Sequence, residues 1–422
     1  MRTKTITFTV LLILFLFCVH SCAYFDIQSR DNFTKEDSKR DNGDKETSTY
    51  NSCVIMGEVI CKNEEDYPVS VIAYPLSFTN KILVDYIILD RAGPFMIYVP
   101  EGRYIIYAVC DINDDSVFET DEVSGIYKEG KEISVENGEI KKGIDITVSR
   151  NNAGKIKFPR ELAIEDDFDT AIYTGGNGQV KKIYDEMFSP EKAAAGWWTP
   201  SSFMKAYGAN IYFAEQYDPA KIPVLFVHGA KGSPQDWVYF LIRLDRSRYQ
   251  PWFFYYPSGM RLSLSSKILY EKLTELQEKY GFNTICIAAH SMGGIVTRAM
   301  LTHQDYSKNI HFVKLYITFA TPWTGYASAD TGMTYSFKKL ASWYDLGQRS
   351  SFIKRVMRAR LPSHVSYYLF YGKQDKVSKG TAIDERVFVE AKDRFGFECD
   401  HETILSDRNV FDQYNEILKK EL

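Results

Sequence analysis

The stretch "CIAAHSMGGIVTRAM", from Cys286 to Met300, decides the fold that this sequence favours. An apolar run is followed by a bend at Ser291 and then by a helical pattern, which is typical of the Gly-x-Ser-x-Gly motif. Ala289 stands where that motif has its first glycine, and Gly293 supplies the second. Both residues are small, as the close approach of strand and helix requires. We therefore predict that Ser291 is a nucleophile, the alternative being an ordinary serine that caps a helix.

The sequence around this bend alternates apolar, strand-like runs with amphipathic helical ones. Four such runs are "IPVLFVHG" (222–229), "QPWFFYYP" (250–257), "IHFVKLYITFATP" (310–322) and "VSYYLFYG" (365–372). Buried strands that alternate with helices form mostly parallel sheets covered by helices on both faces. We therefore predict an α/β class for residues 151–422.

Several short stretches resemble, in their order, the α/β-hydrolase superfamily. Within it they resemble bacterial lipases and the GPI-inositol-deacylase-like group. The similar stretches are "KIPVLFVHGAKGSPQDW", "YYPSG", "AAHSMGGIVTRAML", "ITFATPWTG" and "DHETILSD". The resemblance covers about residues 200–422 and implies a serine esterase or lipase that uses no cofactor for catalysis. An amidase, a thioesterase or an acyltransferase of the same fold remains an alternative.

The order of the catalytic triad in this fold is serine, acid, histidine. His401 is the only one of the seven histidines that lies late enough to follow the acid, so we expect it to be the general base. Asp375 follows the 365–372 run closely and is our preferred acid. Asp384 resembles the aspartate in the Asp-Gly-x-Val pattern of many lipases and is the alternative. Asp400, next to His401, is not expected to orient the imidazole.

The resemblance also implies an oxyanion hole and a cap. By position, the backbone amides of Ala230 and Met292 would bind the oxyanion. An insertion at about residues 323–362 corresponds to a cap over the active site, and its many aromatic residues suit an apolar acyl pocket. The alternative is that these aromatic residues only pack the insertion onto its own domain.

The N-terminus has the pattern of a targeting segment. Arg2 and Lys4 precede an apolar run of twelve residues, Ile6–Phe17, which is short for a membrane span. The following "VHSC" resembles a bacterial lipobox, and Cys22 would carry the lipid. We therefore expect a lipid-anchored protein of the bacterial cell envelope, without a prediction of the membrane face; the alternatives are plain secretion and an uncleaved N-terminal membrane anchor. The polar residues 22–51 are expected to form a disordered tether.

Residues 52–150 contain short alternating segments separated by Gly and Pro, which favour a small β-sandwich. The segment 95–114 resembles prealbumin-like sandwiches. Cys53 and Cys61 are candidates for a disulfide in a hairpin. "DINDDSVFETDE" (111–122) has the spacing of a calcium loop, although Ser116 takes the place of its glycine. The candidate ligands are Asp111, Asn113, Asp115, the Val117 carbonyl, Glu119 and Glu122; the alternative is a solvated acidic loop.

Composition narrows the function further. The chain has 422 residues, 45% of them hydrophobic and 25% charged, with a net charge of −4. Without a basic excess or block, nothing favours binding to nucleic acid. The expected organisation is a signal peptide (1–21), a tether (22–51), a β-sandwich (52–150) and a hydrolase domain (151–422). We predict a membrane-tethered hydrolase of acyl esters or lipids; the non-enzymatic alternative is a surface lipoprotein that binds a glycan or a protein.

Overall fold

The computed structural model describes a defined set of residues. These are residues 53–61, 67–76, 85–89, 91–110, 112, 122–136, 138–152, 155–156, 176–335, 340–378 and 390–422. The predicted signal peptide and tether, including Cys22, and the alternative acid Asp384 lie outside them. No helix within these ranges is long and apolar enough to cross a membrane.

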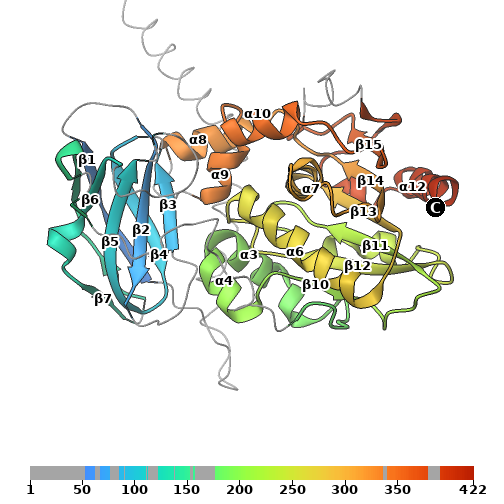
Figure 1. Ribbon diagram of the computed structural model, residues 1–422, viewed down its shortest axis with the longest axis horizontal. Helices are drawn as coiled ribbons and strands as arrows, with labels where there is room; N and C mark the ends of the chain where they lie inside the picture. The colour runs from blue at the N-terminus through green and yellow to red at the C-terminus, as the bar shows by residue number, and fades with distance from the viewer. Residues whose placement is uncertain are drawn as a thin grey trace, which may run out of the picture. The chain divides into compact units, whose positions relative to one another are not determined.

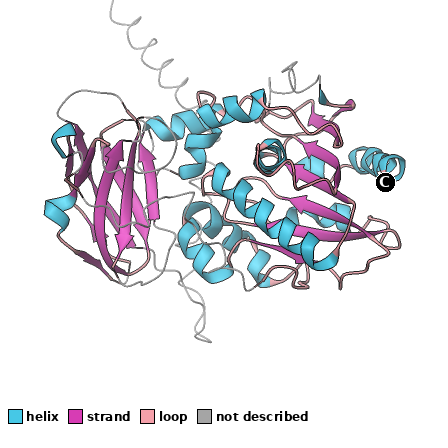
Figure 2. Cartoon of the chain, in the orientation of Figure 1, coloured by secondary structure: helices cyan, strands magenta, loops and turns pink. Residues whose placement is uncertain are grey.

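The N-terminal described residues form strands and short 3-10 turns (Figure 2). One sheet has the order β4-β1-β8, with β9 also paired to β1. The other has the order β3-β2-β5-β6, with β7 also paired to β5. The strands are β1 (Cys53–Cys61), β2 (Val69–Pro75), β3 (Asp85–Leu89), β4 (Pro94–Val99), β5 (Gly102–Cys110), β6 (Ser124–Ile126), β7 (Ile133–Val135), β8 (Ile140–Lys141) and β9 (Ile146–Val148).

The two sheets share one apolar core because their strands alternate inward and outward side chains. In β4, Phe95, Ile97 and Val99 are buried, whereas the residues between them are partly exposed. They pack in the same core as Val71 of β2 and Ile106 of β5. The predicted all-β character is confirmed for this part of the chain. The short strands β6, β7 and β8 were not singled out from the sequence.

The suggested disulfide between Cys53 and Cys61 is wrong. Both residues lie in the single strand β1, at its two ends, and both are free thiols. The eight residue-to-residue steps of extended strand between them span about 26 Å at roughly 3.3 Å per step. A disulfide requires Cα atoms within about 7 Å.

A third sheet contains seven strands within the described residues, in the order β10-β12-β11-β13-β14-β15-β16. Only β10 is antiparallel to its neighbour, and all other pairs are parallel. The predicted mostly parallel sheet is therefore confirmed. The strands are β10 (Asn210–Phe213), β11 (Ile222–Val227), β12 (Tyr249–Tyr255), β13 (Ile285–His290), β14 (Val313–Phe319), β15 (Ser366–Gly372) and β16 (Asp393–Phe397).

Helices cover both faces of this sheet (Figure 1). In β11, Leu225 and Val227 pack in a core with α6 and α7, whereas Val224 and Phe226 pack in a second core with α5 and α12. Consecutive side chains of a strand point to opposite faces, so a strand covered on both sides reads as a continuous apolar run. The main helices are α3 (Pro190–Trp198), α4 (Pro200–Tyr207), α5 (Val238–Leu241), α6 (Leu262–Tyr280), α7 (Met292–Thr302) and α12 (Arg408–Glu421).

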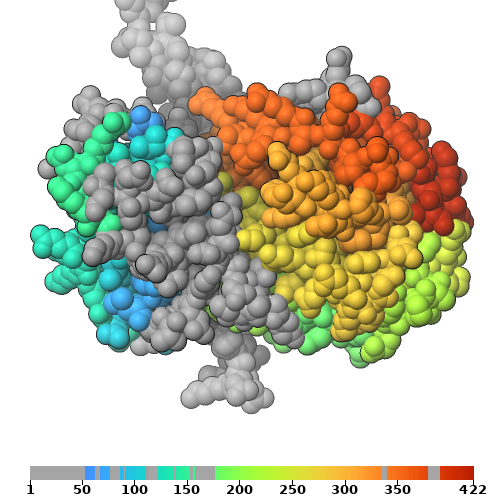
Figure 3. Space-filling model, viewed as in Figure 1, coloured from blue at the N-terminus to red at the C-terminus, as the bar shows by residue number. Residues whose placement is uncertain are grey.

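The described residues of the insertion after β14 form three helices, α8 (Ala327–Tyr335), α9 (Ala341–Leu346) and α10 (Ser351–Arg358). Trp323, Phe352 and Met357 are buried in the same core as α6 and α7. In the space-filling view, the segments of α6, α7 and α10 form one continuous surface (Figure 3). For these three side chains the structure favours the packing interpretation over the lining of an acyl pocket.

A buried ion pair joins this insertion to α6. The Asp345 side chain in α9 is fully buried; one oxygen accepts from Arg261 Nε at 2.9 Å and the other from the Leu262 amide at 2.6 Å. Removing one partner of a buried pair leaves an uncompensated charge. We expect Asp345→Ala to lower the free energy of unfolding by about 3–5 kcal/mol, measured by urea denaturation.

The matched control is Glu398→Ala, which removes an exposed ion pair with Lys373. Solvent screens such a pair, so its loss should change the unfolding free energy by less than about 1 kcal/mol. Equal effects of the two substitutions would contradict the structural role assigned to Asp345.

Candidate active site

The candidate site lies at the carboxyl ends of the parallel strands. The chain passes from β11 outward to β12 and then returns to the other side of β11 as β13. Ligands of open α/β sheets bind where the strand order reverses in this way. His228 follows β11 and Ser291 follows β13, so both lie at this reversal, while Asp375 and His401 follow β15 and β16.

Ser291 occupies a strained bend between β13 and α7. Its backbone has φ 51° and ψ −128°, a conformation that non-glycine residues rarely adopt. The Ser291 amide donates to the Phe319 carbonyl at 2.9 Å, which holds the bend against β14. Its hydroxyl makes no capping hydrogen bond to α7. The geometry therefore does not fit a capping serine, and the hydroxyl is left for another partner.

Small residues make this bend sterically feasible. A Cβ atom on Gly293 would lie 2.4 Å from the His228 carbonyl oxygen, because α7 begins directly against the end of β11. Ala289, which replaces the first glycine of the motif, is fully buried in the core that includes α6 and α7. The core accommodates this methyl group, so the departure from the motif does not alter the bend.

The close approach at Gly293 predicts a loss of stability when a side chain is added. Gly293→Ala would force α7 away from β11, and we expect it to lower the unfolding free energy by about 1–3 kcal/mol. Gly93→Ala is the control, because a Cβ there would have only one neighbour, at 4.0 Å. Urea denaturation of both variants tests this prediction. An unfolding free energy of Gly293→Ala equal to that of the wild type would contradict the close approach of α7 to β11.

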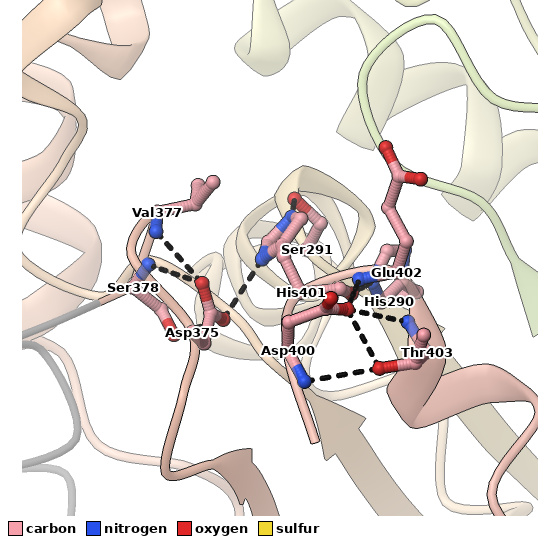
Figure 4. Close-up of polar contacts among 9 residues, drawn as sticks. All are labelled: His290, Ser291, Asp375, Val377, Ser378, Asp400, His401, Glu402 and Thr403. Carbon is pink, nitrogen blue, oxygen red and sulfur yellow. Dashed lines mark hydrogen bonds and ion pairs between the residues drawn. The ribbon is translucent and has the colours of Figure 1, made fainter. Parts of the chain in front are cut away.

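The structure brings Ser291, His401 and Asp375 together (Figure 4). Ser291 Oγ lies 2.9 Å from His401 Nε2, and His401 Nδ1 lies 2.8 Å from Asp375 Oδ2. A carboxylate can only accept, so Nδ1 carries the proton and donates it to Asp375. The remaining nitrogen, Nε2, is then free to accept the hydrogen of the serine hydroxyl.

Asp375 is held as a buried carboxylate. Its Oδ1 accepts from the amides of Val377 and Ser378 at 2.7 and 3.0 Å, and its Oδ2 accepts from the Ser378 hydroxyl at 2.5 Å. Burial acts to raise the pKa of Asp375, but the hydrogen bonds from His401 and Ser378 outweigh it and keep this pKa below its usual value. Asp375 therefore presents a negative charge to the histidine.

Two other acids were weighed for this role from the sequence, Asp384 and Asp400. Asp384 falls outside the described residues. The Asp400 carboxylate accepts from the Glu402 and Thr403 amides at 3.1 and 2.8 Å and from the Thr403 hydroxyl at 2.7 Å (Figure 4). Asp400 thus stabilises the turn that carries His401, through the backbone rather than through the ring.

The family comparison agrees with this topology. Residues 260–379 match the PGAP1-like alpha/beta domain family. The matched segment contains Ser291 and Asp375 and ends before His401. The seven-stranded sheet and its helices form an α/β-hydrolase fold.

Solved structures similar to this chain include α/β-hydrolases from several organisms. The mature lipase of Bacillus licheniformis is 21% identical, with 48% of this chain and 94% of that one covered, at a TM-score of 0.39. A structure from work on carboxylesterases of Nitrososphaera gargenis is 14% identical, with coverage of 50% and 96% and a TM-score of 0.37. Lipase B of Aspergillus fumigatus is 13% identical, with coverage of 50% and 56% and a TM-score of 0.42. No curated protein matches the chain.

The predicted oxyanion amides lie on the two segments that meet at the bend. Met292 is the first residue of α7, so its N–H has no acceptor within the helix. Ala230 lies in the loop after β11, where a Cβ on the preceding Gly229 would be 2.8 Å from Ser291 Cβ. No acceptor for either amide is found among the described residues. In the α/β-hydrolase fold these are the positions that supply the oxyanion hole.

His228 supports this loop, a role that the sequence pattern did not reveal. Its Nδ1 donates to the Gly229 carbonyl at 2.8 Å, and its Nε2 accepts from the Tyr256 amide at 3.4 Å. Burial lowers the pKa of His228 to about 4, so the ring is neutral, as this pair of contacts requires. On the other side of Ala230 in the sequence, the Lys231 amide donates to Ser258 Oγ at 2.9 Å. The loop that carries Ala230 is thus held at two points, before and after Ala230, by the segment that follows β12.

The calcium prediction remains a prediction. Asp111, Asn113, Asp115, Val117 and Glu119 lie outside the described residues. Glu122 is described and buried, and its carboxylate accepts from the Ile112 amide at 3.1 Å. The described residues contain no group of three or more His, Cys, Asp or Glu side chains that could hold a metal ion.

Proposed function

We propose that this chain is a serine hydrolase of carboxylic esters. The observation that carries the proposal is the continuous contact from Ser291 Oγ through the His401 ring to Asp375, with distances of 2.9 and 2.8 Å. The strained backbone of Ser291 adds to it, because backbone strain at a polar side chain clusters at active sites. An ordinary surface serine needs neither feature.

The proposed reaction proceeds in two steps. Ser291 Oγ attacks the ester carbonyl carbon while His401 Nε2 takes the hydroxyl proton, and the Ala230 and Met292 amides stabilise the oxyanion. The tetrahedral intermediate collapses, His401 protonates the leaving alcohol, and an acyl-enzyme remains. His401 Nε2 then takes a proton from a water molecule, whose oxygen attacks the acyl carbon. The bond between the acyl carbon and Ser291 Oγ breaks, His401 returns the proton to Oγ, and the carboxylic acid leaves. Asp375 stays ionised and stabilises the imidazolium in both steps.

We extend the proposal to acyl esters, including lipids, at a membrane of the bacterial cell envelope. The lipobox-like "VHSC" ending at Cys22 supports this location, since a lipid on Cys22 would hold the enzyme beside lipid substrates. Detergent partitioning of the wild type and of Cys22→Ala tests the anchor. The wild type should enter the detergent phase and the variant should not; identical partitioning would refute the anchor.

Covalent labelling tests the hydrolase proposal itself. A fluorophosphonate probe should label the wild type at Ser291 and should not label Ser291→Ala. p-Nitrophenyl esters of graded acyl length then define the preferred acyl chain. A wild type that neither reacts with the probe nor cleaves any of these esters would contradict the proposal and favour a binding protein.

A further inference from the structure

His290 is the residue directly before Ser291, and its side chain is buried beside the candidate triad. It is the last residue of β13 and is only 8% exposed. Its Nε2 lies 2.8 Å from the backbone carbonyl oxygen of His401, and the two rings have centroids 5.0 Å apart (Figure 4). The His290 ring therefore contacts the backbone of His401, the residue whose own ring contacts Ser291 Oγ.

The chemistry of this contact fixes the state of His290. A carbonyl oxygen can only accept, so Nε2 must carry a hydrogen. Burial is the main cause that lowers the pKa of His290 to about 3, with a smaller electrostatic contribution from the neighbouring His401 ring. The ring is therefore neutral near pH 7, with the proton on Nε2. A neutral donor also avoids repelling the imidazolium that His401 would become.

The His401 turn is held on its other side by Asp400, whose carboxylate accepts from the Glu402 and Thr403 amides. Within the part of the chain that the structure describes, no backbone amide is found to donate to the His401 carbonyl. The His290 side chain takes that place. It thereby connects the turn that carries His401 to the strand that carries Ser291.

We propose that His290 is a positioning residue that holds the His401 backbone, so that the imidazole stays aligned with Ser291 Oγ. This inference rests on the proposed hydrolase function and adds a residue to it. Without the contact, the His401 turn can shift relative to β13. Catalysis depends steeply on such alignment, since a displacement of about 1 Å can lower the rate about a hundredfold.

Two variants of similar polarity separate this role from simple packing. The amide nitrogen of Gln reaches the place of a histidine Nε2, whereas that of Asn reaches only the place of Nδ1. We expect His290→Asn to lower kcat about 10- to 100-fold with KM changed less than about twofold. We expect His290→Gln to retain kcat within about threefold, because it keeps the donor. If both variants match the wild type, or if both lose activity equally while folded, the proposal is overturned.

A measurement that needs no activity covers the case of a poorly folded variant. In wild-type protein labelled with ¹⁵N-histidine, the His290 ring should show the neutral tautomer with hydrogen on Nε2 at pH 7, and the resonance should be absent from His290→Gln. The opposite tautomer, or a charged ring, would overturn the proposal. A wild type that shows the expected tautomer but does not react with fluorophosphonate would refute the hydrolase function instead, so the two failures are distinguishable.

Discussion

Ser291→Ala is expected to lower kcat for ester hydrolysis about a millionfold, to near the rate without nucleophilic catalysis. The hydroxyl is the only group on Ser291 that could form the acyl-enzyme, and its oxygen lies 2.9 Å from His401 Nε2, the atom that would take its proton. Hydrolysis of p-nitrophenyl butyrate by purified wild type and variant measures this loss. Retention of more than about one per cent of the activity would mean that another residue is the nucleophile.

The same position allows the backbone strain to be measured separately from the chemistry. Alanine keeps a Cβ at φ 51°, whereas glycine accepts this conformation without steric conflict. Strain of this kind costs about 1–3 kcal/mol, and glycine would relieve it. The greater freedom of glycine in the unfolded chain offsets about 0.5–1 kcal/mol of this gain in stability. We therefore expect Ser291→Gly to be more stable than Ser291→Ala by about 1 kcal/mol in urea denaturation. A less stable glycine variant would contradict the strained bend.

Asp375→Asn is expected to lower kcat about 10⁴-fold while leaving the fold intact. Both oxygens of Asp375 accept hydrogen bonds, from His401 and Ser378 on Oδ2 and from two backbone amides on Oδ1. An asparagine must direct its NH₂ group toward one of these donor pairs. If it faces His401, the imidazole adopts the tautomer with hydrogen on Nε2, and that nitrogen can no longer accept the Ser291 proton.

Asp384→Asn is the matched control, because it changes the acid that the sequence offered as the alternative. We expect its kcat to remain within about threefold of the wild-type value, since Asp375 already accepts the hydrogen bond from His401 Nδ1. Single-turnover kinetics with a p-nitrophenyl ester should show slow acylation for Asp375→Asn only. Loss of activity in Asp384→Asn with retention in Asp375→Asn would reverse the assignment.

Much of the fold could be predicted because the relevant signals are local. Buried parallel strands are continuous apolar runs, and the residues of the Ser291 bend are constrained by steric contacts among neighbours in the chain. The short strands β6, β7 and β8 gave no such signal, since two or three residues cannot show a periodicity. The aromatic residues of the 323–362 insertion were ambiguous for a related reason. Trp323 and Phe352 would look the same in a substrate pocket and in the core that they occupy.

By itself the sequence determined the strand–bend–helix at Ser291, the parallel sheet around it, and His401 as the late histidine. Only the tertiary structure decided which carboxylate contacts His401 and that His290 contacts its backbone. His290 and His401 are 111 positions apart. Their contact forms only once the sheet has assembled and the carboxyl ends of β13 and β16 lie on the same side of it. A hydrogen bond depends on distances of tenths of an ångström and on direction, and neither is encoded in the spacing of residues along the chain.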